Sequence, residues 1–507
     1  MKNLLILSIA LFMASQAEQG MTQSLQQAAV AKGIGQVEET AKLGLTVKRA
    51  KSQETTQVAG THEEVLIVAA IEPASAQVGA SSTIHFVVES EGVLYAADSS
   101  GQFGVWDGAL ETLPASHQNI QLDASVEFTI FQGQIPVQTR LSLFLAYSID
   151  GETALYYTPA PTNLEIADPA QTFLELNDSL PGVNYLQLKA AVEAAQQLPY
   201  LNSLLVAKDG QLVMEEYFDG SNSDTLHHVR SVTKSITAMV VGKAIEDEVF
   251  SSVNQSLGSI QGAHFPLLGG AKGSIEIRHL LSMTGGFDWN ESDGILYDQW
   301  AESADPIGFL LSRDLVTSPG TAFAYNSAAV NLFSPLVTTV TGKAFDSFAQ
   351  EVLLTPLDIN VSDWEILGNG LPNSSGGMEM RPLDLVKLGN LILNKGLVLD
   401  TSNQVQRVIG EAWLNDMFVP RVAVNEEFGD FSLESYANLW WIVNAGGMKV
   451  YLAWGWGGQF LGVIPALDLV LVTTADWETT GAAQASLQEQ SIAGLLINSV
   501  IPAFFGP

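Results

Sequence analysis

The stretch RSVTKSITAMVVGKAIEDE, residues 230–248, predicts a helix that begins beside a reactive serine. Apolar residues recur in it at the spacing of one helix face, namely Ile236, Met239, Val240 and Ala244. The helix therefore begins at or near Ser231, and Lys234 lies one turn later on the same face. A serine in this position has unpaired backbone N–H groups and a favourable dipole beside it, and these stabilise the oxyanion that its own attack creates.

Such a serine also needs a base, because its hydroxyl is inert until a proton is removed. The neutral amine of Lys234, three residues after Ser231, is placed to take that proton. Lowering a lysine pKa from about 10.4 to near 7 requires ~4–5 kcal/mol, which burial or a neighbouring cation has to supply. The alternative for a Ser-x-x-Lys pattern is an N-capping serine followed by a solvated lysine.

Two later segments add to the pattern. In PGTAFAYNS, residues 319–327, a turn precedes Tyr325, whose phenol can relay a proton between nucleophile and leaving group. In WGWGGQF, residues 454–460, a glycine-rich run enters a strand, and the lack of side chains lets a substrate lie against the backbone. The alternatives are a half-buried tyrosine on a helix cap and a tight bend in a sheet.

Together these segments resemble the serine β-lactamase and penicillin-binding-protein superfamily, in its class C-related branch with esterases and amide hydrolases. The resemblance runs from about Val183 to the C-terminus and includes IRHLLSMTGG, residues 277–286, and GGMEMRPLDLVKLG, residues 376–389. It implies a β-lactamase/transpeptidase-like domain. The resemblance also implies that Ser231 is the nucleophile, Lys234 its general base and Tyr325 the catalytic phenol.

The resemblance further implies an oxyanion hole made of the backbone N–H groups of Ser231 and Gln459. Other residues at matching positions are expected to bind substrate: Trp456, Gly457, Gly458, Asn326 and Ser327.

Two positions depart from the family pattern. Ser327 stands where many members have an asparagine that binds the acyl amide of a substrate, unless Asn326 compensates. The strand triad Trp456-Gly457-Gly458 stands where β-lactamases carry Lys-Thr-Gly, so the cation and the hydroxyl that hold a β-lactam carboxylate are missing. A Trp offers an apolar wall and an indole N–H instead, which looks like the esterase-type variants of the family.

The chain organisation predicts an α+β hydrolase domain preceded by a small β-sandwich. Short segments with period-two alternation indicate the sandwich, and strands at both ends of a helical middle indicate that the two ends of the hydrolase domain share one sheet. We expect the sandwich to be a spacer or dimerisation module rather than a glycan-binding one, because Trp106 and Tyr147 are isolated aromatics that a core would also use. The expected parts are a signal peptide (1–17), a flexible leader (18–62), the sandwich (63–168), a linker (169–182) and the hydrolase domain (183–507).

Composition excludes several classes of function. The chain has 22 Lys and Arg residues against 55 Asp and Glu residues, a net charge of −33, and it has no run of basic residues, so nucleic acid is not an expected partner. Cysteine is absent, which excludes disulfides, thiolate metal sites and a Cys nucleophile. No G-x-S-x-G, H-E-x-x-H or G-x-x-x-x-G-K motif is present. The pair His227 and His228 is a weak metal candidate, and we expect neither a metal nor a cofactor.

The sequence therefore predicts an exported serine hydrolase that acts through a Ser231 acyl-enzyme on an ester or small amide. A β-lactamase or D-alanyl-D-alanine carboxypeptidase is the alternative, and a non-catalytic binding protein on the same fold is a third. A signal and no cysteine favour the bacterial periplasm or the medium. We expect a small-molecule substrate and no stable membrane insertion, and the oligomeric state is left open.

Overall fold

The structure is a computed structural model that falls into two compact units. Unit 1 contains residues 1–169 with 401–405, and unit 2 contains residues 170–400 with 406–507. The predicted signal peptide, residues 1–17, lies outside the described residues. The structure describes residues 26–27, 29–31, 41–50, 55, 57–59, 64–109, 112–135, 139–152, 154–166, 176–292, 294–361, 363–399, 404–478 and 481–505.

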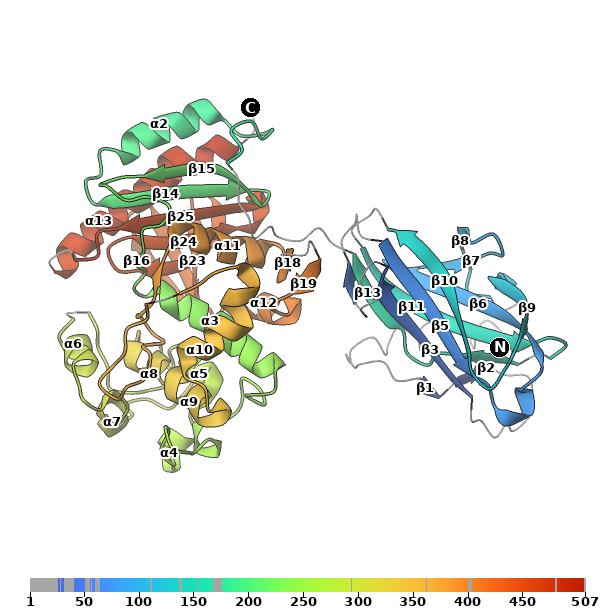
Figure 1. The fold of residues 1–507 in the computed structure, drawn as a ribbon. Coiled ribbons are helices and arrows are strands. Elements are labelled where there is room, and N and C mark those ends of the chain that lie inside the picture. Colours follow the sequence, from blue (N-terminus) through green and yellow to red (C-terminus); the bar gives the residue numbers. More distant parts are fainter. Residues whose placement is uncertain are drawn as a thin grey trace. The chain divides into compact units, whose positions relative to one another are not determined.

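The described part of unit 1 consists of two β-sheets (Figure 1). The first sheet has the strand order β1 (Gln26–Gln27), β3 (Lys42–Arg49), β5 (Glu64–Glu72), β10 (Val126–Gln134). The second sheet has nine strands: β2 (Ala29–Ala31), β4 (Val58–Ala59), β6 (Ser81–Ser90), β7 (Val93–Ala97), β8 (Phe103–Val105), β9 (His117–Gln121), β11 (Thr139–Ile149), β12 (Leu155–Tyr157) and β13 (Thr162–Ile166).

Period-two alternation packs these sheets face to face. Alternate residues of β5 are buried, and they share one apolar core with inward residues of β6 and β11 from the other sheet. Tyr147 is fully buried in this core, stacks on Tyr156 and donates to Gln77, while Trp106 is half-buried and donates to the carbonyl of Ala109. The predicted β-sandwich is confirmed, and both aromatics are bonded within their own unit.

The leader differs from the sequence prediction. Residues Lys42–Arg49 form strand β3, which pairs with β5 along its whole length. Leu43, Leu45 and Val47 are buried in the sandwich core. The predicted flexible leader of residues 18–62 is therefore wrong for this stretch. Alternate residues of KLGLTVKR form an apolar face, although the composition around it is polar.

Unit 2 is built on one eight-stranded antiparallel sheet. Its order brings β14 and β15 from the start of the unit beside β25 from its end, so the predicted sharing of one sheet by the two ends is confirmed. The hairpin β14–β15 turns at Asp209 and Gly210, both at positive φ, as the sequence predicts. The strands are β15 (Gln211–Tyr217), β14 (Leu201–Lys208), β25 (Leu469–Ala475), β24 (Gln459–Ile464), β23 (Met448–Gly455), β22 (Trp441–Ala445), β21 (Phe431–Tyr436) and β20 (Val422–Phe428).

Helices and two small two-stranded sheets complete unit 2. The small sheets are β16 (His227–His228) with β17 (Glu379–Met380), and β18 (Leu397–Leu399) with β19 (Val405–Arg407). The helices are α2 (Tyr185–Ala195), α3 (Val232–Glu246), α4 (Gly270–Gly273), α5 (Ile277–Leu281), α6 (Ile295–Ala301), α7 (Pro306–Ser312), α8 (Ser327–Asn331), α9 (Phe333–Thr341), α10 (Phe345–Ala349), α11 (Pro382–Leu393), α12 (Glu411–Met417) and α13 (Ala482–Leu495).

The large sheet is buried on both faces. Residues Val470 and Val472 of β25 pack in the core that contains α3 and α11, while Leu469 and Leu471 pack in the core that contains α2 and α13 (Figure 1). Most residues of α3 are buried, including the polar Thr233, Lys234, Ser235 and Thr237, so protein surrounds the helix on nearly all sides. No helix in the described ranges is long and apolar enough to cross a membrane.

Candidate active site

Ser231 stands at the N-terminus of α3, as the sequence predicts. It is the N-cap residue of the helix and is half-buried. Arg230, directly before it, has φ of 51°, and the preceding Val229 donates its N–H to the carbonyl of Met378 at 3.0 Å. Among the described residues, no backbone carbonyl accepts a hydrogen bond from the N–H of Ser231. This N–H is therefore free to act on a substrate oxygen.

Lys234 lies beside Ser231 and is almost fully buried, at 2% exposure. Its Nζ donates to Oγ of Ser231 at 2.8 Å and to the carbonyl of Ser375 at 2.7 Å. Burial lowers the pKa of Lys234 to about 8, the charge of Glu291 opposes this shift, and the charge of Arg230 adds to it. At a pKa of about 8, about one molecule in ten carries the neutral amine at pH 7. Burial thus supplies most of the pKa shift that Lys234 needs in order to act as a base near pH 7.

Tyr325 completes a group of three polar side chains. Its hydroxyl faces the side chain of Ser231. Nζ of Lys234 lies 5.1 Å from the centre of the Tyr325 ring, and that ring stacks on Trp441 at 6.1 Å and 15°. Burial, followed by the charge of Glu291, raises the pKa of Tyr325. The phenol is therefore protonated near neutral pH and can donate a proton.

Glu291 is a neighbour of this group that the sequence patterns did not reveal. It lies in the loop before α6, and its oxygens accept hydrogen bonds from the Ser327 backbone at 2.6 Å, the Ser327 hydroxyl at 2.9 Å and the Trp289 indole at 2.9 Å. Its charge raises the pKa of both Lys234 and Tyr325. No motif marks this residue, and its contact with Ser327 spans 36 positions of sequence.

The side chains of the two residues after Tyr325 form hydrogen bonds within the chain. The side chain of Asn326 caps α8 by accepting from the N–H of Ala329 at 2.8 Å, and the Ser327 hydroxyl is bonded to Glu291. Both residues are buried, at 4% and 1% exposure. The Asn326 carbonyl oxygen and the Ser327 hydroxyl therefore each have a partner within the chain, and their role in binding substrate stays a prediction.

The glycine-rich run forms the turn between β23 and β24. An added Cβ on Gly455 would lie 2.3 Å from the carbonyl oxygen of Val229, so this turn passes directly against the chain that leads into Ser231. Gly457 and Gly458 have φ of 82° and 98°, a region that favours glycine. Trp456, at 36% exposure, is an exposed side chain of the turn.

Two side chains of α13 hold the peptide groups of this turn. The carboxylate of Glu489 accepts from the Gly457 N–H at 2.8 Å, and the amide of Gln488 donates to the Gly457 carbonyl at 2.7 Å. An added Cβ on Gly458 would lie 2.3 Å from Cδ1 of Ile492. Close packing of the turn against α13 thus explains these glycines more directly than access of a substrate to the backbone does.

Gln459 begins β24 directly after the turn. Its side chain is fully buried, donates to the carbonyl of Ala475 at 2.7 Å and accepts from the Ala475 N–H at 3.1 Å. These bonds fix the end of β24 to the end of β25. The role predicted for Gln459 is donation by its backbone N–H to the oxyanion. The two side-chain hydrogen bonds hold the peptide that carries this N–H in place.

One cation near the nucleophile has no carboxylate partner in the described part of the chain. The guanidinium of Arg230 lies 5.0 Å from the centre of the Trp477 ring, and its charge lowers the pKa of both Lys234 and His228. Two other arginines of unit 2 that could hold an anion are ion-paired, Arg381 with Asp224 and Asp384, and Arg421 with Asp416.

The two adjacent histidines lie in a short strand. His227 and His228 form β16, which pairs with Met380 and Glu379 of β17. Burial lowers the pKa of both histidines to about 4. Among the described residues, no group of three or more His, Asp or Glu side chains is arranged to hold a metal ion.

Comparison with known proteins places this arrangement in context. Residues 190–492, more than half of the chain, match the family described as Beta-lactamase. The 6-aminohexanoate-dimer hydrolase of Paenarthrobacter ureafaciens is 24% identical over a comparison of 301 residues, and the match covers 54% of this chain and 72% of that protein.

Two solved structures are among those to which this chain is similar. The octameric penicillin-binding protein homologue from Pyrococcus abyssi has a TM-score of 0.47 and 18% identity, and the match covers 62% of this chain and 77% of that one. The penicillin binding protein from Bacillus halodurans has a TM-score of 0.45 and 17% identity, with 60% and 98% covered.

Proposed function

This chain belongs to the Beta-lactamase family and is a serine hydrolase, and from this premise we propose that it cleaves an ester or small amide through an acyl-enzyme on Ser231. The observation that carries the proposal is the 2.8 Å contact between Nζ of Lys234 and Oγ of Ser231, made by a lysine whose pKa is lowered to about 8. A nucleophile and a base within hydrogen-bond reach are the signature of covalent catalysis.

In the acylation step, the neutral amine of Lys234 takes the proton of Ser231 as Oγ attacks the substrate carbonyl carbon. The negative charge on the carbonyl oxygen is stabilised by the N–H groups of Ser231 and Gln459. Tyr325 donates its proton to the leaving alcohol or amine and recovers one from the Lys234 ammonium. The bond to the leaving group then breaks, so the proton of Ser231 ends on the departing product.

In the deacylation step, a water molecule attacks the acyl carbon, and the Tyr325 and Lys234 pair accepts its proton. The bond between the acyl carbon and Oγ breaks, Ser231 regains a proton, and a carboxylic acid leaves. The overall reaction consumes one water and needs no cofactor.

Both ester and amide substrates have support. The strand triad Trp456-Gly457-Gly458 contains no cation and no hydroxyl, which suits a neutral acyl group. The 24% identical relative is named for a 6-aminohexanoate dimer, and two amino acids condensed in a chain are joined by an amide bond. We include an amide in the proposal for that reason.

A β-lactamase or D-alanyl-D-alanine carboxypeptidase is the second candidate, and Arg230 is the observation that favours it. This half-buried guanidinium has no carboxylate partner among the described residues and directly precedes the nucleophile. A cation there suits a substrate that carries a carboxylate. Against it, the triad lacks the cationic and hydroxyl side chains that the family uses for this purpose.

Turnover of p-nitrophenyl acetate and butyrate, set beside nitrocefin, separates these candidates. Hydrolysis of the esters with little turnover of nitrocefin is the expected result. Comparable turnover of nitrocefin would replace the ester proposal by the second candidate. If none of the three substrates is hydrolysed and a fluorophosphonate does not label Ser231, the third hypothesis, a non-catalytic binding protein, remains.

We also propose that the protein is exported. Met1–Ala17 carries one lysine, an apolar run and small residues before Glu18, the form of a cleavable signal, and the chain contains no cysteine. N-terminal sequencing of protein recovered from the periplasm and the medium tests this. An intact Met1 on cytoplasmic protein would contradict it.

A further inference from the structure

Unit 1 contains a cavity of about 460 Å³ between its two sheets. Small-molecule sites have volumes of about 300–1,000 Å³ and mostly apolar walls with a few polar groups. The residues around the cavity come from β5 and β10 of one sheet and from β6, β7, β8 and β11 of the other. At this end of the sandwich, therefore, the side chains of the two sheets do not fill the space between them.

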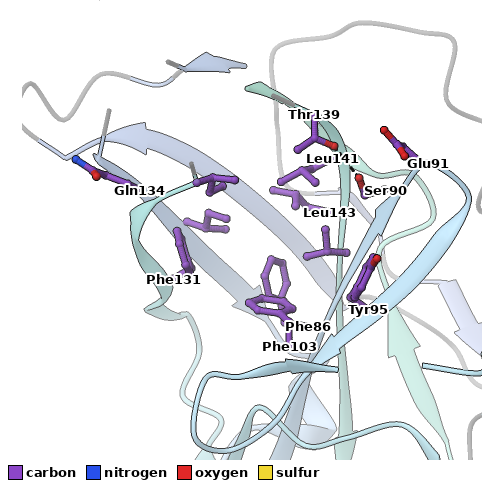
Figure 2. A pocket seen from close by; sticks show the side chains of 13 residues that line it. Phe86, Ser90, Glu91, Tyr95, Phe103, Phe131, Gln134, Thr139, Leu141 and Leu143 are labelled. Carbon is purple, nitrogen blue, oxygen red and sulfur yellow. Dashed lines mark hydrogen bonds between the residues drawn. The ribbon is translucent and has the colours of Figure 1, made fainter. Parts of the chain in front are cut away.

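The walls of the cavity are aromatic and aliphatic. Phe86 and Phe103 pack edge to face at 5.8 Å and form one end of it, and Leu141 and Leu143 of β11 line a side. Figure 2 shows these side chains directed toward a common space. Phe103 is 40% exposed although it lies on this lining, so apolar surface faces water when the cavity is unfilled.

A local irregularity of β10 builds the opposite wall. The register of β10 against β5 shifts between Thr129 and Phe131, a β-bulge that turns Phe131 toward the cavity. The ring of Phe131 lies over Gly133, where an added Cβ would be 3.3 Å from Cζ. The bulge and the glycine thus place an aromatic ring where an unbroken alternation would not.

Polar groups gather at the other end of the cavity. Figure 2 shows Ser90, Glu91 and Thr139 there, away from the Phe86 and Phe103 rings. The hydroxyls of Ser90 and Thr139 are bonded to each other at 2.7 Å. The Tyr95 hydroxyl and the exposed Glu91 carboxylate have no hydrogen-bond or ion-pair partner among the described residues.

Charge decides which head group suits this end. Glu91 is the charged residue among those that line the cavity, and none of them is Lys or Arg. The whole chain carries a net charge of −33, which repels anions. A fatty-acid carboxylate would meet no counter-charge, whereas an amine would meet Glu91.

We propose that this cavity binds an alkyl or arylalkyl amine, with its apolar body against the phenylalanine rings and its ammonium head beside Glu91. The site is separate from the Ser231 group, which lies in the other unit, so this proposal does not depend on the proposed catalysis.

The test measures binding of octylamine, octanol and octanoate to the full chain by displacement of N-phenyl-1-naphthylamine. Octylamine is expected to bind about fivefold more tightly than octanol, the worth of one exposed charge pair at about 4 Å. Octanoate is expected to bind more weakly than octanol. Replacing octylamine by hexylamine should weaken binding by about tenfold, because two methylene groups leave the apolar wall.

Matched variants locate the site. Glu91→Gln, at an exposed position, is expected to remove the preference for the amine and leave octanol unchanged. Glu127→Gln removes an exposed carboxylate from β10 that does not line the cavity, and it should change nothing. Leu141→Trp fills the cavity and should abolish binding of all three ligands, with circular dichroism as the check on folding.

Three outcomes would overturn the proposal. The first is the absence of saturable binding by any of the three ligands to the unmodified chain. The second is equal binding of octanoate and octylamine that Glu91→Gln leaves unchanged. An effect of Glu127→Gln equal to that of Glu91→Gln would show general attraction to an acidic surface and would equally overturn the assignment to this cavity.

Discussion

The carboxylate of Glu489 accepts a hydrogen bond from the backbone N–H of Gly457 at 2.8 Å, in an environment where burial raises the pKa of Glu489 to about 7. The turn that precedes the proposed oxyanion donor Gln459 is thus held by an acid of the C-terminal helix. Its protonation state changes within the pH range where the lysine base also titrates, so the two effects have to be separated by experiment.

The first prediction concerns stability. A carboxyl group whose pKa is raised on folding stabilises the protein fully below its unfolded pKa of about 4.5, and this stability is lost as pH rises to about 7. The loss amounts to about 3 kcal/mol at 1.36 kcal/mol per unit. Glu489→Gln keeps an acceptor for Gly457 and cannot ionise, so its free energy of unfolding should not show this decline. Urea unfolding at pH 4.5, 6 and 8 measures it.

The control for that measurement is Glu193→Gln on the exposed side of α2. It should follow the unmodified protein at every pH, and because each variant is compared with the unmodified chain, contributions of unit 1 cancel. Parallel curves for Glu489→Gln and the unmodified protein would show that Glu489 has an ordinary pKa.

The second prediction concerns the nucleophile and its base. Ser231→Ala should abolish labelling by a fluorophosphonate and all ester turnover. Lys234→Met removes the amine, fills the same volume and should lower kcat by roughly 10²–10⁴-fold, the usual contribution of a general base. Ser274→Ala, a surface serine of the same unit, is the matched control. Labelling of Ser231→Ala at the unmodified rate would show that another serine is the nucleophile.

The third prediction is a pH profile. Lys234 acts as a base only when neutral, so kcat/KM should rise with pH and level off above a midpoint of about 8. Glu291→Gln removes a charge that raises the pKa of Lys234 and should move the midpoint to lower pH. Arg230→Gln removes a charge that lowers this pKa and should move the midpoint to higher pH. Shifts in the same direction for both variants would contradict the assignment of the midpoint to Lys234.

The fourth prediction separates the two units. Every residue of the proposed catalytic group lies in unit 2, which has its own sheet and its own apolar cores. Deletion of residues through Asp168 should therefore leave small-ester turnover within about twofold of the full chain, because it removes no residue of this group. A soluble, folded truncation without activity would show that unit 1 contributes to catalysis.

The proximity of Ser231 and Lys234 was predictable because its signal is local. Ser231 and Lys234 are three positions apart, which places them together on any helix, and the apolar spacing that follows predicts that helix. Glu291 and Glu489 were missed because their partners Ser327 and Gly457 are 36 and 32 positions away. Contacts over such distances depend on how loops and helices pack, and no spacing rule encodes them.

The fold was predictable for a similar reason, with one instructive failure. Alternation and turn residues located the hairpin at Asp209 and Gly210 and the sandwich strands. The same alternation runs through Lys42–Arg49, but the Gln- and Thr-rich neighbours of that stretch suggested a flexible leader. Composition averages over a window, whereas a strand needs only a few alternating apolar residues to join a sheet.

The last prediction concerns selectivity. A carboxylate held by a cationic lysine and a hydroxyl gains charge-assisted hydrogen bonds of roughly 1.5–3 kcal/mol each, and the triad Trp456-Gly457-Gly458 supplies neither. We therefore expect kcat/KM to favour neutral short-chain esters over penicillins and cephalosporins by at least ~100-fold. Parallel assays with p-nitrophenyl butyrate and nitrocefin measure the ratio.

A matched pair of variants then assigns the origin of this ratio. Trp456→Lys should lower the ratio of ester to β-lactam turnover, because it restores a cation at an exposed position of the turn. Gly457→Thr is not included, because Gly457 has φ of 82° and an added Cβ would lie 2.9 Å from the Asp476 carbonyl oxygen. Arg230→Gln should raise the same ratio if the guanidinium already contributes to binding the β-lactam carboxylate. Should the unmodified protein hydrolyse nitrocefin as efficiently as the ester, and Arg230→Gln abolish only the former, then Arg230 replaces the missing triad lysine and the second candidate function stands.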